Sequence, residues 1–96
     1  EIGAECGYYA AVCLYRLNRY DEAEEKVFEV SEKYGNYLYW TACSFIVLSD
    51  VYVAKDNDFQ AKETLKSVIE NYPQDEKNYN EVMKESKERL DALNAE

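Results

Sequence analysis

The chain has 96 residues, which suits one small domain, and 20 Asp and Glu against 11 Lys and Arg give it a formal charge of −9. Three Gly and one Pro are too few for a turn-rich β fold, and 47% hydrophobic residues argue against disorder. An acidic chain is repelled by phosphate backbones and anionic lipid, and no apolar run reaches the roughly 18 to 20 residues of a membrane span, so we expect neither nucleic acid binding nor direct membrane insertion.

The first helix is expected over residues 2–17, where apolar side chains recur every three or four positions. This predicted stripe is Cys6, Ala10, Cys13, Leu14 and Leu17. The three cysteines (the third is Cys43) are an odd number, and Cys6 and Cys13 would lie about 10 Å apart along a helix, beyond the roughly 7 Å limit for a disulfide. The chain has no His. We therefore expect three buried cysteines and no metal site.

A second helix is expected over residues 21–34, with acidic residues in its first turn, where the helix dipole favours them. Its predicted buried stripe is Ala23, Val27, Val30 and Tyr34. Gly35 is expected to end this helix in the way that a Gly just beyond a helix end usually does.

The central segment, residues 37–54, carries a single charge, Asp50. Its β-branched residues would suit a strand, but its length without a turn signal favours a helix. Its apolar residues fall on every side, so we expect a helix that is packed on both sides.

A fourth helix is expected over residues 59–72, ended by Pro73, and a fifth runs from Asp75 or Asn78 to about Ala95. The inward residues of the fourth helix are Ala61, Leu65, Val68, Ile69 and Tyr72. The narrow apolar stripe of the fifth helix is Tyr79, Val82, Met83, Leu90 and Leu93, and the rest of that helix is expected to face water.

The second and fourth helices repeat one pattern 38 positions apart, and the first and third helices follow the same offset. Ala23 corresponds to Ala61, and Val30 corresponds to Val68. A period in this range is typical of stacked helical hairpins.

The repeat resembles the tetratricopeptide repeat, whose unit is a pair of antiparallel helices. The residues that carry the resemblance in the first unit are Ala11, Leu14, Tyr20, Ala23, Val27 and Val30, with Gly35 where Pro is usual. In the second unit they are Ser49, Tyr52, Ala61, Leu65, Val68 and Pro73. Asn18 and Asp56 replace the family's turn Gly, and Gly7 and Phe45 stand at its signature Trp position.

The resemblance implies an all-α fold, a right-handed α-solenoid fragment in one domain over residues 1–96. Two antiparallel hairpins, residues 4–36 and 37–73, would be followed by a capping helix over 75–95. The central and later segments also resemble the C-terminal repeats of long bacterial proteins of this family associated with the cell envelope. This implies a fragment of a longer protein in the envelope or periplasm of a bacterium, with the cytoplasm left open.

The family's binding positions, carried over residue by residue, mark one stripe on each first helix of a pair. They fall on Glu5, Tyr8, Val12, Tyr15 and Arg16, and on Cys43, Ile46, Asp50 and Val53. Such a concave face would hold a peptide or a partner helix, with tyrosines as flat anchors. Asp50 is expected to face the solvent of the groove or to pair with Arg16. The same positions could instead contact preceding repeats or a second copy of the chain, or be ordinary surface.

Ten tyrosines in 96 residues is a high number, and aromatic side chains are favoured at interfaces. Five of them are not explained by repeat positions and gather near the first helix and the start of the third: Tyr8, Tyr9, Tyr15, Tyr37 and Tyr39. Their grouping suggests an interface.

The sequence holds no His, no Gly-rich phosphate loop, no nucleophile motif and no metal-ligand spacing, so we expect no enzyme and no cofactor. The expected function is a non-catalytic protein-interaction or scaffold module. The alternative is a purely structural terminal segment of a longer array, serving as an end cap or in self-association.

Overall fold

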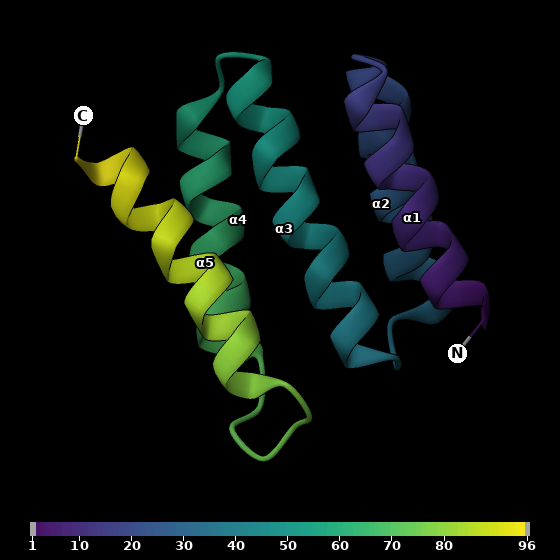
Figure 1. Ribbon diagram of the computed structural model, residues 1–96, viewed down its shortest axis with the longest axis vertical. Coiled ribbons are helices and arrows are strands. Elements are labelled where there is room, and N and C mark those ends of the chain that lie inside the picture. The colour runs from purple at the N-terminus through teal and green to yellow at the C-terminus, as the bar shows by residue number, and fades with distance from the viewer. Residues whose placement is uncertain (1, 96) are drawn as a thin grey trace.

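The computed structural model describes residues 2–95, and over that range the chain forms five α-helices and no strand (Figure 1). They are α1 (Ile2–Arg16), α2 (Tyr20–Tyr34), α3 (Leu38–Ala54), α4 (Asp58–Asn71) and α5 (Tyr79–Asn94). The prediction of an all-α fold with five helices is confirmed. Of the two starts expected for the last helix, Asn78 is confirmed and Asp75 is wrong. Asn78 caps α5, whose first residue is Tyr79, and residues 74–78 form turns and a bend.

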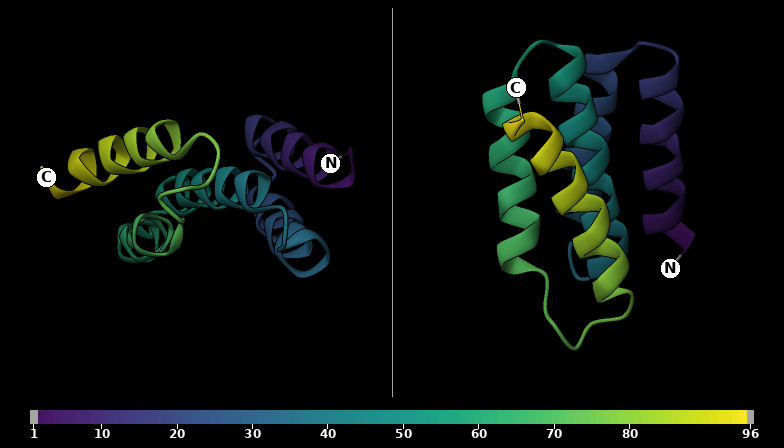
Figure 2. Two further views of the ribbon diagram at one scale, coloured as in Figure 1. Left: turned by 90° about the horizontal axis from the view of Figure 1, so that it is seen from below. Right: turned by 60° about the vertical axis from the view of Figure 1, so that its left-hand side comes forward.

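The helices form two antiparallel hairpins and a fifth helix laid across the second hairpin. α3 packs against both α1 and α2, and α5 packs on α3 and α4. Viewed end on, α1 and α5 lie on one side of α3 while α2 and α4 lie on the other (Figure 2). α3 is therefore covered on both sides, as its all-round apolar sequence predicts.

The turn inside each hairpin has the same geometry 38 positions apart. Asn18 and Asp56 take the left-handed conformation, with φ of 63° and 60°. In both turns the next residue donates a backbone hydrogen bond to the carbonyl five positions earlier, at 2.9 and 2.8 Å. Asn and Asp tolerate this conformation better than most other side chains, so they can stand where the family has Gly.

Gly35 behaves differently from the prediction. Its φ of −60° is right-handed, so it does not end α2 by a left-handed turn. A Cβ at this position would lie 2.6 Å from the backbone oxygen of Ser31. Gly35 is thus required by a close backbone approach and not by a positive φ.

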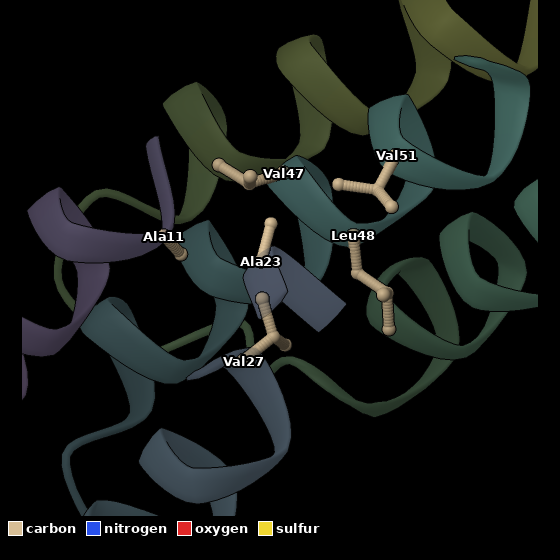
Figure 3. Close-up of a cluster of buried hydrophobic side chains, with 6 residues drawn as sticks. All are labelled: Ala11, Ala23, Val27, Val47, Leu48 and Val51. Carbon is tan, nitrogen blue, oxygen red and sulfur yellow. The ribbon is translucent and has the colours of Figure 1, made fainter. Parts of the chain in front are cut away.

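Two clusters of buried side chains hold the helices together. The first joins α1, α2 and α3 and contains Ala11, Ala23, Val27, Val47, Leu48 and Val51 (Figure 3). The second joins α3, α4 and α5 and contains Ala42, Ile46, Val68, Tyr72, Val82 and Met83. Full burial of a Val, Leu, Ile or Met side chain stabilises a fold by about 1.5–3 kcal/mol, so these clusters fix the order of the helices.

The stripes predicted for the other helices are largely confirmed. Ala23, Val27 and Val30 of α2 are buried, whereas Tyr34 is half-buried. Of the five inward positions predicted for the fourth helix, four are buried and Ile69 is half-buried. On α5, Val82 and Met83 are buried, and Tyr79, Leu90 and Leu93 are half-buried.

The stripe predicted for α1 is wrong in part. Cys6 and Cys13 are exposed, Leu17 lies beyond the end of α1 with 64% of its surface exposed, and Cys43 is only partly buried. The prediction that all three cysteines are buried therefore fails for Cys6 and Cys13.

The buried side of α1 is instead its row of smallest residues. Ala4 and Ala11 are fully buried, and Gly3 and Gly7 face α2. A Cβ on Gly7 would lie 2.4 Å from Cγ2 of Val30, so the two helix backbones approach closely there. Small residues lie on two neighbouring sides of α1, one with Cys6 and Cys13 and the other with Gly7 and Ala11. α2 packs on the side with Gly7, where the two backbones can come close.

Candidate functional site

We use the name concave face, after the binding side of the resembled repeats, for the side of α3 on which α1 and α5 lie. Figure 1 looks onto this face, and α1 and α5 do not contact each other across residues 2–95. Every position predicted for binding lies on α1 or α3, which line it.

On α1, Tyr8, Val12 and Tyr15 are half-buried, while Glu5 and Arg16 are exposed. The centroid of the Tyr15 ring lies 5.9 Å from that of Tyr20, the first residue of α2, so the Tyr15 ring packs against α2. Burial raises the pKa of the phenols of Tyr8 and Tyr15. Both hydroxyls are therefore neutral at physiological pH and can donate hydrogen bonds.

On α3, the four predicted positions have different surroundings. Ile46 is 6% exposed because it packs in the cluster that contains Val82 and Met83 of α5. Cys43 and Asp50 are partly buried, and Val53 is 40% exposed. α5 therefore covers part of the side of α3 that was expected to meet a partner.

The partner of Asp50 is Arg89 of α5, and the expected pairing with Arg16 is wrong. Nε and Nη2 of Arg89 donate to the two carboxylate oxygens of Asp50 at 3.0 and 3.2 Å. Nη1 of Arg89 also donates to Glu85 at 2.7 Å. Burial lowers the pKa of the Arg89 guanidinium, but its hydrogen bonds with Asp50 and Glu85 outweigh this and raise it. The guanidinium is therefore always charged. A bidentate pair of this kind fixes geometry and ties α5 to α3.

Four aromatic rings form a row across one end of the concave face. Tyr9, Tyr8, Trp40 and Tyr39 follow one another with ring centroids 4.9, 5.6 and 5.0 Å apart. The Tyr39 hydroxyl donates to Oε2 of Glu81 on α5 at 3.0 Å. This aromatic row therefore runs from α1 over the start of α3 to α5.

The structure places three of the five grouped tyrosines in the aromatic row, Tyr8, Tyr9 and Tyr39. Tyr15 lies apart from it, and Tyr37 pairs with Tyr34 at 6.4 Å. Trp40 was not among the predicted site residues, although a lone Trp close to two tyrosines was a usable signal. Arg89 was not predicted either, because it lies in the fifth helix, outside the two repeated units.

Cys43 lies beside the aromatic row and is the least exposed of the three thiols. Burial raises its pKa to about 11, against a smaller lowering by the Tyr39 hydroxyl. Over residues 2–95, no three or more His, Cys, Asp or Glu side chains gather as metal ligands would. Within the same range, no helix has the length and apolar character to cross a membrane.

Comparison with known protein families gives a match over the second hairpin. Residues 37–75 match the family model of the tetratricopeptide repeat, a span that covers α3, α4 and the start of the following turn. No curated protein and no solved structure matches the chain. Tetratricopeptide repeats generally mediate protein–protein interactions and are not catalytic. Over residues 37–75 the chain is thus similar to the tetratricopeptide repeat.

Proposed function

We propose that the protein is a non-catalytic interaction module that binds an extended peptide or a partner helix on its concave face. The observation that carries the proposal is the aromatic row of Tyr9, Tyr8, Trp40 and Tyr39, which crosses this face from α1 toward α5. Aromatic side chains supply large contact area at little entropic cost and are enriched among residues that dominate binding energy.

The two ends of the concave face differ in chemistry. The aromatic row offers flat apolar surface for the aromatic, aliphatic or Pro side chains of a partner. Farther along α3, the Asp50–Arg89 pair and the neutral Tyr15 hydroxyl offer polar contacts. A partner with an apolar anchor at one end and a polar group about 15 Å away would be held in one direction, because Asp50 follows Trp40 by ten residues on α3, which rises about 1.5 Å per residue.

The test begins with peptides selected from a displayed library on the immobilised protein. We expect the Tyr8→Ala plus Tyr15→Ala variant to lose at least about tenfold in affinity for them, because both rings would be anchors. Phe59→Ala is the matched control, since Phe59 is 69% exposed and lies on α4, away from the concave face. Unchanged affinity with unchanged helicity in the double variant would contradict the proposal.

A second candidate function is that of a structural segment in a longer array, and a comparison within the chain favours it. Cys6 and Cys13 are exposed, but the residues 38 positions later, Ser44 and Val51, are fully buried. Val51 packs in the cluster that joins α3 to the first hairpin. The outer side of α1 is thus the surface on which another hairpin would stack.

Thiol alkylation distinguishes this second candidate. If another hairpin stacks on α1 in the native protein isolated from cells, Cys6 and Cys13 should react more slowly with a small maleimide there than in the isolated 96-residue chain. Equal reaction rates in the two preparations would rule out a stacked hairpin at this surface.

A further inference from the structure

A groove runs along the opposite side of the molecule, between α2 and α4, and we call it the back groove. α2 and α4 do not contact each other within residues 2–95, and both lie on the side of α3 away from the concave face (Figure 2). Two adjoining cavities of about 210 and 300 Å³ share Phe45 and Ser67. They adjoin at these residues and follow one another along α3, and together they make up the back groove.

The floor of the back groove is one stripe of α3, at the three- and four-residue spacing of a single helix face. It consists of Leu38, Thr41, Ala42, Phe45, Leu48 and Tyr52. Phe28 of α2 lines the groove with 47% of its surface exposed, and its ring meets that of Phe45 at 6.4 Å. Exposed apolar surface gathered in a groove is typical of a docking site.

The α4 wall of the back groove is uncharged at four positions, Gln60, Thr64, Ser67 and Asn71. The residues 38 positions earlier on α2 are Glu22, Lys26, Glu29 and Lys33. There Glu29 pairs with Lys26 at 2.6 Å and with Lys33 at 3.0 Å, a ladder that keeps the helix soluble. On α4 the ladder is replaced by side chains that need no counter-charge, and Thr64 and Ser67 are small enough for another helix to approach.

The rims of the back groove are acidic. Glu63 lines the groove, and Glu25 and Glu32 stand one turn before and after Phe28 on α2. Glu63 has Lys66 at 3.6 Å, whereas Glu25 and Glu32 have no basic side chain within ion-pair distance in residues 2–95. A second copy of the chain would bring another charge of −9 to this surface, so a basic partner is favoured over self-association.

We propose that the back groove docks an amphipathic helix of a partner protein, with an apolar stripe against Phe28 and Phe45 and with Lys or Arg on its flanks. The floor from Leu38 to Tyr52 is about 21 Å long, which corresponds to about 14 residues of such a helix. This site is separate from the proposed concave-face site, because the two faces lie on opposite sides of α3.

The test uses a labelled synthetic peptide of about 14 residues. Leu recurs in it at every third and fourth position and Lys fills the rest. Its affinity is measured by fluorescence anisotropy at physiological salt, next to a scrambled peptide of the same composition. We expect the patterned peptide to bind at least about tenfold more tightly than the scrambled one, because only the patterned peptide can present an apolar stripe.

Variants of two exposed phenylalanines localise the binding. Phe28→Ala should weaken it at least about tenfold, while Phe59→Ala, whose ring lies outside the groove, should leave it unchanged. Ser67→Lys places a cation where the two cavities meet and should also weaken binding, without depending on the packing of Phe28. The Tyr8→Ala plus Tyr15→Ala variant should bind normally, which separates this proposal from the concave-face function.

Three results would overturn the proposal. The first is equal affinity for the patterned and scrambled peptides. The second is a failure of the variants to localise binding: an equal loss of affinity in Phe28→Ala and Phe59→Ala, or an unchanged affinity in Ser67→Lys. The third is a dimer in sedimentation experiments that Phe28→Ala dissociates, because the occupant of the groove would then be a second copy of the chain.

Discussion

Replacing Gly7 by Ala tests how closely α1 and α2 pack. The new Cβ would lie 2.4 Å from Cγ2 of Val30, whereas ordinary contacts are 3.4–4 Å. Val30 is 1% exposed and β-branched, so it has one favoured rotamer in a helix and little room to move. Overpacking of this kind costs about 1–3 kcal/mol, while the higher helix propensity of Ala returns about 1 kcal/mol. We expect a net destabilisation of roughly 1 kcal/mol.

The clash is isolated by a second substitution. In a Val30→Ala background the space opposite residue 7 is empty, so Gly7→Ala should then stabilise the protein by about 1 kcal/mol through helix propensity alone. Unfolding free energies from urea titration followed by circular dichroism give the coupling between the two sites. We expect a coupling of at least about 1 kcal/mol. If Gly7→Ala has the same effect in both backgrounds, the close packing of α1 on α2 is wrong.

Three further predictions follow from single contacts. Asp56→Gly should raise the unfolding free energy by roughly 0.5–1 kcal/mol, and with it the thermal midpoint, because Gly adopts a φ of 60° without strain. Asn18→Gly should gain less, because it loses the 2.8 Å bond from the Tyr20 hydroxyl, and the reverse order would contradict this reasoning. At pH 8, iodoacetamide should modify Cys6 and Cys13 quickly and Cys43 slowly. The Cys43 rate should rise as the pH approaches about 11, where its thiolate forms, and equal rates by peptide mass spectrometry would refute its burial. Arg89→Met should lower the unfolding free energy by about 1–2 kcal/mol and speed hydrogen exchange in α5, because Asp50 loses both bonds. Glu85→Gln leaves the Asp50–Arg89 pair intact and should lower the unfolding free energy by less. An equal loss in the two variants would contradict the inference that the Asp50–Arg89 pair holds α5 on α3.

The 38-residue repeat made most of the fold predictable. Because the repeat is visible within the chain's own sequence, both hairpins and the turn positions Asn18 and Asp56 could be located without a template. Their shared left-handed conformation and the match of residues 37–75 to the family agree with that reading.

The choice of helix face was harder to predict on α1. The Cys6 and Cys13 side and the Gly7 and Ala11 side are both small and apolar. Which one is buried depends on the shape of α2, where Cγ2 of Val30 would lie 2.4 Å from a Cβ on residue 7. Periodicity alone does not contain that information.

The candidate site depended on contacts that are distant in sequence. Arg89 reaches Asp50 across 39 positions, and Trp40 meets Tyr8 across the two hairpins. Arg89 belongs to α5, which the repeat comparison did not cover, so its role was not predictable from the repeated units. The α5 helix also decides which part of α3 stays open, since it covers Ile46.

The most direct test of the concave-face function is an NMR titration of the protein, labelled with nitrogen-15, with a peptide selected on it. We predict that the largest shifts fall on the amides around Tyr8, Val12 and Tyr15 and on the indole N–H of Trp40, with the amides of α2 and α4 little changed. Shifts centred on α2 and α4, or spread evenly over all five helices, would contradict it.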